Sequence, residues 1–151
     1  MKKLHLIILI LIISSCSGYK PIFSSKDINF FINEITIPEN DRISFKIKKK
    51  LKPYTLKETN RDEININIES YKKLNIIAKD NKGDASMFNL IVISNINLLS
   101  DNILQKNYKF TEKFTFKNQE NKFELEQYKT SLENELIDKI FEKLILNLRT
   151  R

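Results

Sequence analysis

The sequence predicts an α+β fold: a two-layer sandwich of order β-α-β-β-β-α, in which a four-stranded, mostly antiparallel sheet carries two helices on one face. Two patterns predict it. Isoleucine alternates with polar residues from Ile64 to Glu69, which is typical of a half-buried strand. From Lys122 to Leu148 the apolar residues instead recur with a helical period. A helix this long must cover a large apolar surface, and one face of the sheet is the natural surface.

The first strand is expected at residues 28–37. Ile28, Phe30 and Ile32 share one face, and the apolar phase changes before Ile35. Pro38 then ends the strand because proline lacks the N–H that a sheet interior needs.

The first helix is expected to begin near Arg42, with Asp41 as its N-cap. Pro53 disfavours helical geometry at Lys52, so the helix should end there. Three residues at a spacing of four form its narrow apolar stripe: Ile43, Ile47 and Leu51.

The second strand begins with the alternating isoleucines and should continue through Tyr71, Leu74 and Ile76, with a bulge where the phase slips. Residues 80–84 have turn chemistry, and Gly83 can supply a positive φ. Residues 87–99 are apolar and β-branched, which predicts a central third strand with both faces covered.

The fourth strand should pair with the third as an antiparallel hairpin. Its aromatic residues share one parity, interrupted by Glu112, and are interpreted as core: Tyr108, Phe110, Phe114 and Phe116. Residues 118–121 form a turn and an N-cap region for the last helix. That helix carries its main stripe on Leu125, Tyr128, Leu132, Leu136, Ile140, Leu144 and Leu148, widened by Ile137, Phe141 and Ile145.

The N-terminus has the pattern of a secretory signal peptide. Lys2 and Lys3 precede an apolar run, and small residues precede Cys16. The run is about half of the ~20 residues needed to cross a bilayer, so it does not predict a transmembrane anchor. We therefore expect a signal peptide at residues 1–15, a tether at 16–27 and a single α+β domain at 28–151.

The order aliphatic-Ser-Ser-Cys at residues 13–16 resembles a bacterial lipobox, in which the signal peptide is cleaved just before the cysteine. The resemblance implies a diacylglycerol thioether and an N-acyl chain on Cys16, and no other cofactor. Two or more acyl chains give stable membrane anchoring. An ordinary signal peptide with an incidental cysteine is the alternative.

The chemistry left after cleavage argues against an enzyme. Removing residues 1–15 from the 151 leaves 136, with no histidine and with Cys16 as the one cysteine, occupied by lipid. A Ser-His or Cys-His nucleophile and a His/Cys metal site are therefore excluded. Two glycines cannot make a glycine-rich phosphate loop. Glu112 is more simply a rim residue than a catalytic acid, so we predict no catalytic and no metal site.

Lysines are the candidate binding residues. The net charge is +7, or +5 after Lys2 and Lys3 are removed, which suits anionic partners. Lys46 and Lys49 lie in a lysine cluster on the first helix, whose alternative reading is a solvated face. Lys79 and Lys82 flank an exposed turn and have the same alternative. No nucleic-acid motif is present, and an envelope protein would not meet nucleic acid.

The residues after Cys16, Ser17 to Phe23, resemble the Cys-Gly-aromatic-x-Pro-Leu-Tyr opening of the lipopolysaccharide-assembly lipoprotein family, LptE, with the first glycine displaced by one position. The element order and a long C-terminal helix beginning near Tyr128 also resemble that family. The resemblance implies a lipid-anchored outer-membrane protein facing the periplasm. It also implies that the protein fills an LptD-type β-barrel and assists insertion of lipopolysaccharide into the outer leaflet. Lys46, Lys49, Lys79 and Lys82 are the candidate lipopolysaccharide contacts.

Two other functions stay open at this point. One is an accessory lipoprotein of an inner-membrane lipid or solute ABC transporter. Ser17 is not the aspartate that retains some lipoproteins there, which favours the outer membrane. The other is a periplasmic hydrolase that works through carboxylates, against which the missing histidine argues.

Overall fold

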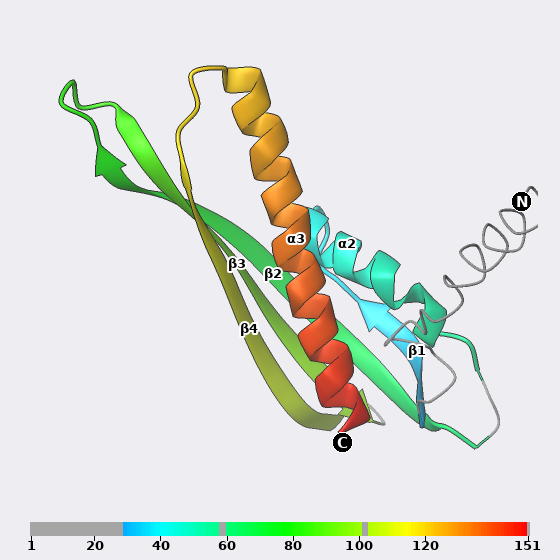
Figure 1. Cartoon of the computed structure of the whole chain (residues 1–151). Helices are drawn as coiled ribbons and strands as arrows, with labels where there is room; N and C mark the ends of the chain where they lie inside the picture. The colour runs from blue at the N-terminus through cyan, green and yellow to red at the C-terminus, as the bar shows by residue number, and fades with distance from the viewer. Residues whose placement is uncertain (1–28, 58–59, 101–102, 151) are drawn as a thin grey trace, which may run out of the picture.

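The computed structural model describes residues 29–57, 60–100 and 103–150. Cys16 and the predicted segments 1–15 and 16–27 lie outside them. The elements follow the predicted order (Figure 1). They are β1 (Phe30–Thr36), α2 (Arg42–Leu51), the short 3₁₀ helix η3 (Lys52–Tyr54), β2 (Asp62–Lys79), β3 (Ala85–Ser100), β4 (Ile103–Lys117) and α3 (Lys122–Arg149).

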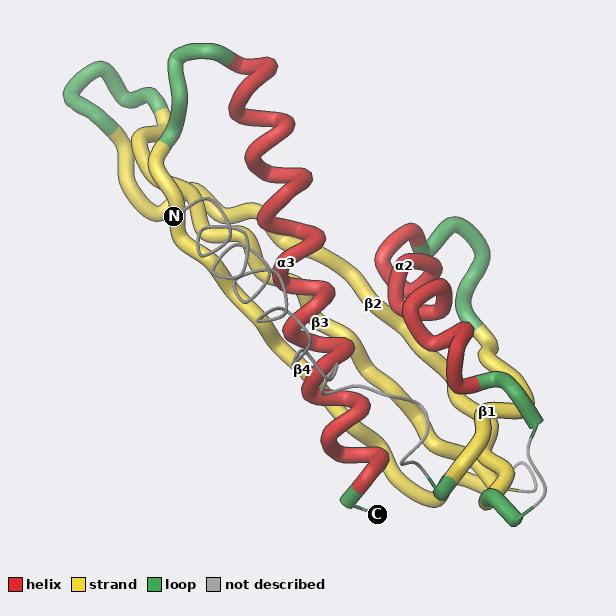
Figure 2. The backbone as a smooth tube through the Cα atoms, turned by 45° about the vertical axis from the view of Figure 1, so that its right-hand side comes forward, coloured by secondary structure: helices red, strands yellow, loops and turns green. Residues whose placement is uncertain are grey.

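The four strands form one sheet in the order β1-β2-β3-β4. β1 runs parallel to β2, and the other two pairs are antiparallel. Figure 2 shows α2 and α3 on the same side of this sheet. The α+β two-layer prediction is therefore confirmed.

The helix boundaries follow from their caps. The Asp41 carboxylate accepts hydrogen bonds from the N–H groups of Ile43 and Ser44, and Asn121 does the same for Phe123 and Glu124. These side chains satisfy backbone donors that have no partner inside the helix. Both predicted N-cap regions are confirmed.

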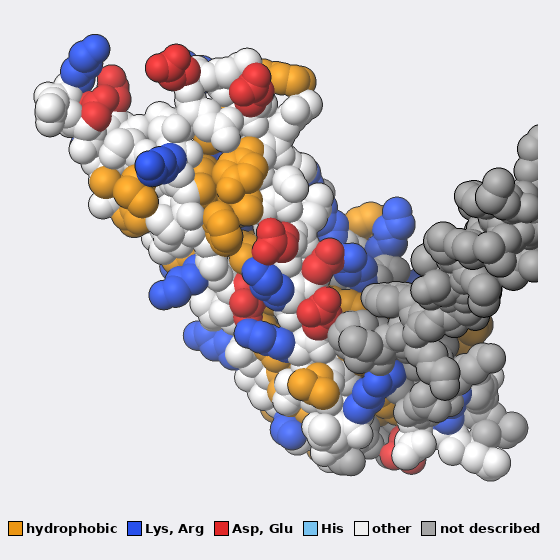
Figure 3. Space-filling view, viewed as in Figure 1, with side chains coloured by type: hydrophobic (Ala, Val, Ile, Leu, Met, Phe, Trp, Pro, Cys, Tyr) orange, Lys and Arg blue, Asp and Glu red, His pale blue; other side chains and the backbone are white. Residues whose placement is uncertain are grey.

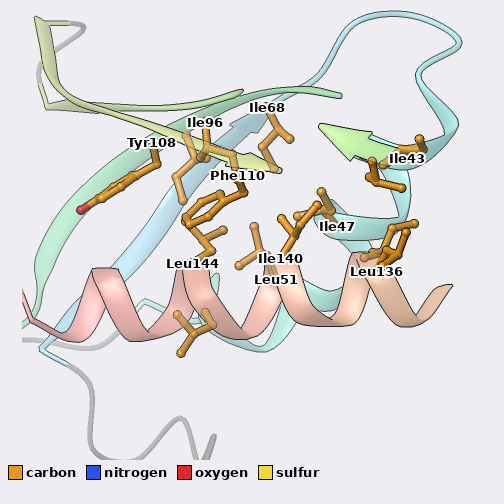
Figure 4. Close-up of a cluster of buried hydrophobic side chains, with 14 of the residues drawn as sticks. Ile43, Ile47, Leu51, Ile68, Ile96, Tyr108, Phe110, Leu136, Ile140 and Leu144 are labelled. Carbon is orange, nitrogen blue, oxygen red and sulfur yellow. The ribbon is translucent and has the colours of Figure 1, made fainter. Parts of the chain in front are cut away.

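The core lies between the sheet and the two helices (Figure 4). Ile47 of α2, Ile68 of β2 and Ile140 of α3 are 0% exposed and meet there. Tyr108, Phe110 and Phe116 are buried and Phe114 packs against the same cluster, so the aromatic stripe belongs to the core, as predicted.

The phase change predicted in the first strand is confirmed. The β1–β2 register shifts between Ile32 and Glu34, which lets both Ile32 and Ile35 face the core. The bulge predicted inside the second strand is misplaced. Pairing with β3 is regular from Asn65 to Ile76, and the register shifts only after Ile76.

The reason for that misplacement lies in side-chain parity. Tyr71 points to the opposite face of the sheet from Ile68, whereas Leu74 and Ile76 keep the phase of Ile68. Polar Ser70 and Lys72 occupy core-facing positions between them. The apolar pattern was interrupted by these polar residues, and the strand itself was continuous.

The prediction that both faces of the third strand are covered is wrong. β3 is central, but both helices lie on one face of the sheet, and residues of its other face, such as Ile91 and Ile93, are partly exposed. That face carries asparagine, threonine and lysine beside these isoleucines. It needs no covering helix, as is common in antiparallel sheets.

The sheet is longer than its cover on one side. β1 pairs only with residues 62–67 of β2. We call the part of the sheet up to Ile68 of β2, where α2 and α3 both lie over the inner face, the proximal half. We call the part from Lys72 of β2 to the turn of residues 80–84 and the loop of residues 118–121 the distal half, with Ser70 at the boundary. In the distal half only α3 lies over the inner face (Figures 1 and 2).

Candidate binding surface

A buried hydroxyl chain marks the boundary between the two halves. Ser44 and Ser94 are 0% exposed. The Ser44 hydroxyl donates to the Asp41 carboxylate at 2.5 Å and lies 3.0 Å from the Ser70 hydroxyl, which is 2.8 Å from that of Ser94. Because each hydroxyl has one proton, the Ser44 hydroxyl can donate either to the Asp41 carboxylate or to the Ser70 hydroxyl, and either Ser70 or Ser94 can be the donor between those two.

Asp41 also connects this chain to the sheet. Its Oδ2 atom accepts the backbone N–H of Ser70 at 2.8 Å. Asp41 therefore takes the place of a neighbouring strand at Ser70, just beyond the point where β1 ends. The network fixes the start of α2 against β2.

An ion cluster lies beside this network. The Glu133 side chain is 4% exposed and accepts hydrogen bonds from Lys46 of α2 and Lys72 of β2, each at 2.6 Å. Burial raises the pKa of the Glu133 carboxyl, but the hydrogen bonds and charges of the two lysines outweigh burial and lower that pKa below its ordinary value. Glu133 therefore stays ionised and joins three elements.

The predicted first-helix lysines thus divide by position. Lys46 donates to Glu133 and Asn134, and Lys50 lies 2.5 Å from the Asp138 carboxylate, so both join α2 to α3. Lys49 is exposed and lines a hollow of about 550 Å³ between the two helices. Neither the binding reading nor the solvated reading anticipated the pairing across helices.

The other predicted lysines lie at the distal tip. Lys79 ends β2 and Lys82 lies in the turn, and both are exposed. Among the described residues, neither has an acidic partner. Asp80 instead accepts the backbone N–H groups of Lys82 and Asp84, which holds the turn, and Gly83 has a φ of +88° there.

The distal half exposes large apolar side chains next to these lysines. On β2, Leu74 is 44% exposed and Ile76 is 53% exposed. On α3, Phe123 is 70% exposed and Tyr128 is 36% exposed. Figure 3 shows part of this apolar surface between the upper turns of α3 and the strands. An apolar patch of this kind is typical of a binding surface.

Aromatic rings of the core lie in the same half of the molecule, and one of them has a cation beside it. Phe88 and Phe116 stack with their centroids 5.5 Å apart, and Tyr128 meets Phe116 edge-on at 5.7 Å. The Lys129 ammonium lies 5.3 Å from the Phe88 centroid. Lys129 also pairs with Glu126 at 2.8 Å. Lys79 and Lys82 therefore remain as ammonium groups of the distal half that have no acidic partner among the described residues.

A second basic surface was missed from the sequence. Lys109, Lys113 and Lys117 lie on the outer face of β4, are exposed, and have no acidic partner in the described part of the chain. Their spacing of four residues places them on one face of a strand. The signal was present, because they have the opposite parity to the aromatic stripe.

No cluster of potential metal ligands is found in the described residues. Over the same residues, the search for a helix sufficiently long and apolar to cross a bilayer finds none. Glu112, considered above as an acid, pairs with Lys143 of α3 at the rim of the core.

Comparison with known proteins gives structural neighbours. No family model matches, and a search of curated proteins finds no match. The fold is similar to that of rare lipoprotein B from Shewanella oneidensis, with 10% identity, a TM-score of 0.55, and coverage of 76% of this chain and 96% of that one.

Two further neighbours have a TM-score of 0.61. Lipoprotein B from Nitrosomonas europaea is 15% identical and the match covers 87% of this chain and 90% of that one. A minor lipoprotein from Acinetobacter baumannii is 12% identical, with coverage of 82% and 92%. At these identities the comparison shows a shared fold.

Proposed function

We propose that the chain is an envelope lipoprotein that is anchored by acyl chains on Cys16 and faces the periplasm from the outer membrane. The observation that carries the proposal is the fold, because it is shared with three bacterial proteins that are named lipoproteins. The lipobox-like sequence before Cys16 supports it independently.

We further propose that this lipoprotein fills a large outer-membrane β-barrel of the LptD type. Such barrels have polar lumens. The uncovered face of the sheet is rich in asparagine, threonine and lysine, including Lys109 and Lys113. A polar, basic face of this kind can contact the polar wall of a barrel lumen directly.

Lipopolysaccharide is the proposed ligand of the distal half. Exposed Leu74, Ile76 and Phe123 can contact acyl chains. Lys79 and Lys82 can donate charge-assisted hydrogen bonds to phosphates. Along β2, the 17 steps from Asp62 to Lys79 at about 3.3 Å each place this end about 56 Å from the start of β1, which pairs with Asp62. The start of β1 and the proposed ligand surface are therefore at opposite ends of the sheet.

We propose no enzymatic activity and no cofactor beyond the covalent acyl chains. The polar groups at the boundary support this proposal, because Asp41 caps α2 and Glu133 pairs with two lysines.

Extraction of membranes in mild detergent tests the barrel proposal. The lipidated chain should co-purify in equal amounts with one large β-barrel from the outer membrane, and Cys16→Ala should abolish membrane retention. Recovery of a monomer alone would contradict the proposal. Recovery from the inner membrane with an ATPase would instead support a transporter accessory.

Ligand binding tests the role of the distal lysines. Replacement of Lys79 and Lys82 by alanine should lower the affinity for purified lipopolysaccharide about fivefold per lysine, since a lysine near an anionic lipid surface contributes about 1 kcal/mol. The matched control replaces Lys109 and Lys113 on the opposite face. Equal losses in both double variants would show non-specific charge attraction.

A further inference from the structure

Among the residues that the structure describes, no strand pairs with one edge of β2 in its distal half, and we call this the open edge. β1 pairs with β2 only as far as Asn67, and Asp41 occupies the next position at Ser70. From Lys72 to Ile76, β2 has β3 on one side and no strand among the described residues on the other.

The direction of the Ser70 N–H shows which residues of β2 point their backbone groups toward this edge. The Ser70 N–H points away from β3, because it donates to Asp41. Backbone N–H and C=O groups alternate in direction along a strand, and the pairing with β3 is regular over this stretch. The groups of Lys72, Leu74 and Ile76 therefore point outward at the same edge as that of Ser70.

The opposite edge of the sheet differs in its side chains. By the same alternation, the outward backbone groups of β4 belong to odd-numbered residues, and three of these are the exposed lysines Lys109, Lys113 and Lys117. Lysines on an edge strand discourage pairing with another chain. The β2 edge instead presents Leu74 and Ile76, which are 44% and 53% exposed.

Charge selects the kind of strand that this edge accepts. Residues 71–79 contain three lysines and no acid. Lys72 is paired with Glu133, but Lys73 and Lys79 have no acidic partner among the described residues. A second copy of this chain would bring the same lysines to the same edge and be repelled, whereas an acidic strand would be attracted. Lipid acyl chains are a third possible occupant. They could contact Leu74, but they have no donors or acceptors for hydrogen bonds to the outward backbone groups.

We propose that residues 72–76 of β2 accept an extended, acidic polypeptide segment as an added strand, with apolar side chains of the segment packed on Leu74 and Ile76. Strand addition of this kind takes affinity from main-chain hydrogen bonds and specificity from alternate side chains. The inference is independent of lipid anchoring and of the barrel assignment.

The experiment uses the full chain and a capped peptide of roughly nine residues in which valine alternates with glutamate and threonine. Binding is followed by fluorescence anisotropy of labelled peptide, and amide hydrogen exchange is measured at Lys72, Leu74 and Ile76. We expect saturable binding and slower exchange at these three amides. Absence of binding, or binding without slower exchange there, would overturn the proposal.

Two comparisons distinguish strand addition from non-specific hydrophobic or electrostatic binding. A peptide N-methylated at alternate residues cannot form the ladder, and we expect at least about tenfold weaker binding to the unchanged protein. The variant with Leu74→Glu and Ile76→Glu should bind the parent peptide at least about tenfold more weakly, because it loses the apolar contacts and repels the glutamates, whereas Thr111→Glu with Thr115→Glu on β4 should not. Equal binding of the methylated peptide, or an equal loss in both glutamate variants, would refute the proposal. So would peptide-independent dimerisation through this edge.

Discussion

The same inner face of the same sheet has two different environments in its proximal and distal halves. Ile68 in the proximal half is 0% exposed, because α2 and α3 both lie over it. Ile76, eight residues along the same strand and on the same face, is 53% exposed. The residue type and the parity are identical. The difference shows that burial depends on which elements cover a strand.

The row of polar residues at the boundary separates the two environments. Ser70, Ser94 and Lys72 face inward where α2 ends its cover, and each has a polar partner there. The buried cluster continues past this row under α3, where Leu90, Phe116 and Leu125 belong to it. The polar row therefore marks where burial ends along β2, beyond which Leu74 and Ile76 are exposed.

The largest expected effect is truncation in the proximal half. Ile140→Ala removes a side chain that is 0% exposed between sheet and helices. We expect it to lower the free energy of unfolding by about 4 kcal/mol. Leu74→Ala in the distal half, 44% exposed, should cost less than about 1 kcal/mol. Urea denaturation measures both, and equal losses would break the distinction between the halves.

The next largest loss of stability is expected at Asp41, at the boundary between the two halves. Asp41→Ala removes the cap of α2, the acceptor for Ser44 and the acceptor for the Ser70 N–H. We expect a loss of about 3 kcal/mol, since a cap contributes about 1 kcal/mol and each hydrogen bond to a charged group a similar or larger amount. Asn121→Ala, which removes only a cap, is the matched control and should cost about 1 kcal/mol.

The ion cluster predicts a pH dependence. Lys46 and Lys72 lower the pKa of Glu133 in the folded state, so the carboxylate stabilises the fold above its ordinary pKa of 4.5. That stabilisation is lost as pH falls through the lowered, folded-state pKa. Glu133→Gln should therefore cost about 1–2 kcal/mol at pH 7.

The difference between the two proteins should shrink below pH 4.5. Urea denaturation at several pH values measures this. A constant difference across the acid range would mean that Glu133 contributes by packing alone. Glu135→Gln, at an exposed intrahelical pair with Lys139, serves as the control with little effect.

The elements of the fold could be predicted because each has a local signal. Asp41 and Asn121 mark helix starts, Gly83 marks a turn, and the alternating isoleucines mark β2. These signals act over a few residues, so they are readable from the chain. The misplaced bulge arose because polar Ser70 and Lys72 interrupted an apolar pattern for reasons of tertiary structure.

The partners of the charged side chains could not be predicted. Glu133 lies 87 residues from Lys46 and 61 from Lys72, and only the packing of α3 against α2 and β2 brings them together. For the same reason the open edge of β2 was not visible in the sequence. Its existence depends on where β1 stops pairing.

The smallest loss of stability is expected for two exposed phenylalanines, one in each half, and their effect on ligand binding tests the difference between the halves most directly. Phe123 on the distal turn of α3 is 70% exposed, and Phe45 on α2 in the proximal half is 58% exposed. Phe123→Ser and Phe45→Ser should each change the free energy of unfolding by about 0.5 kcal/mol or less, because both side chains stay mostly exposed in the folded protein. If the distal half is the ligand surface, Phe123→Ser alone should weaken lipopolysaccharide binding, since it alone removes apolar area from that surface. Equal binding by both variants would show that the exposed distal side chains have no role in the ligand contact, even though the fold leaves them uncovered.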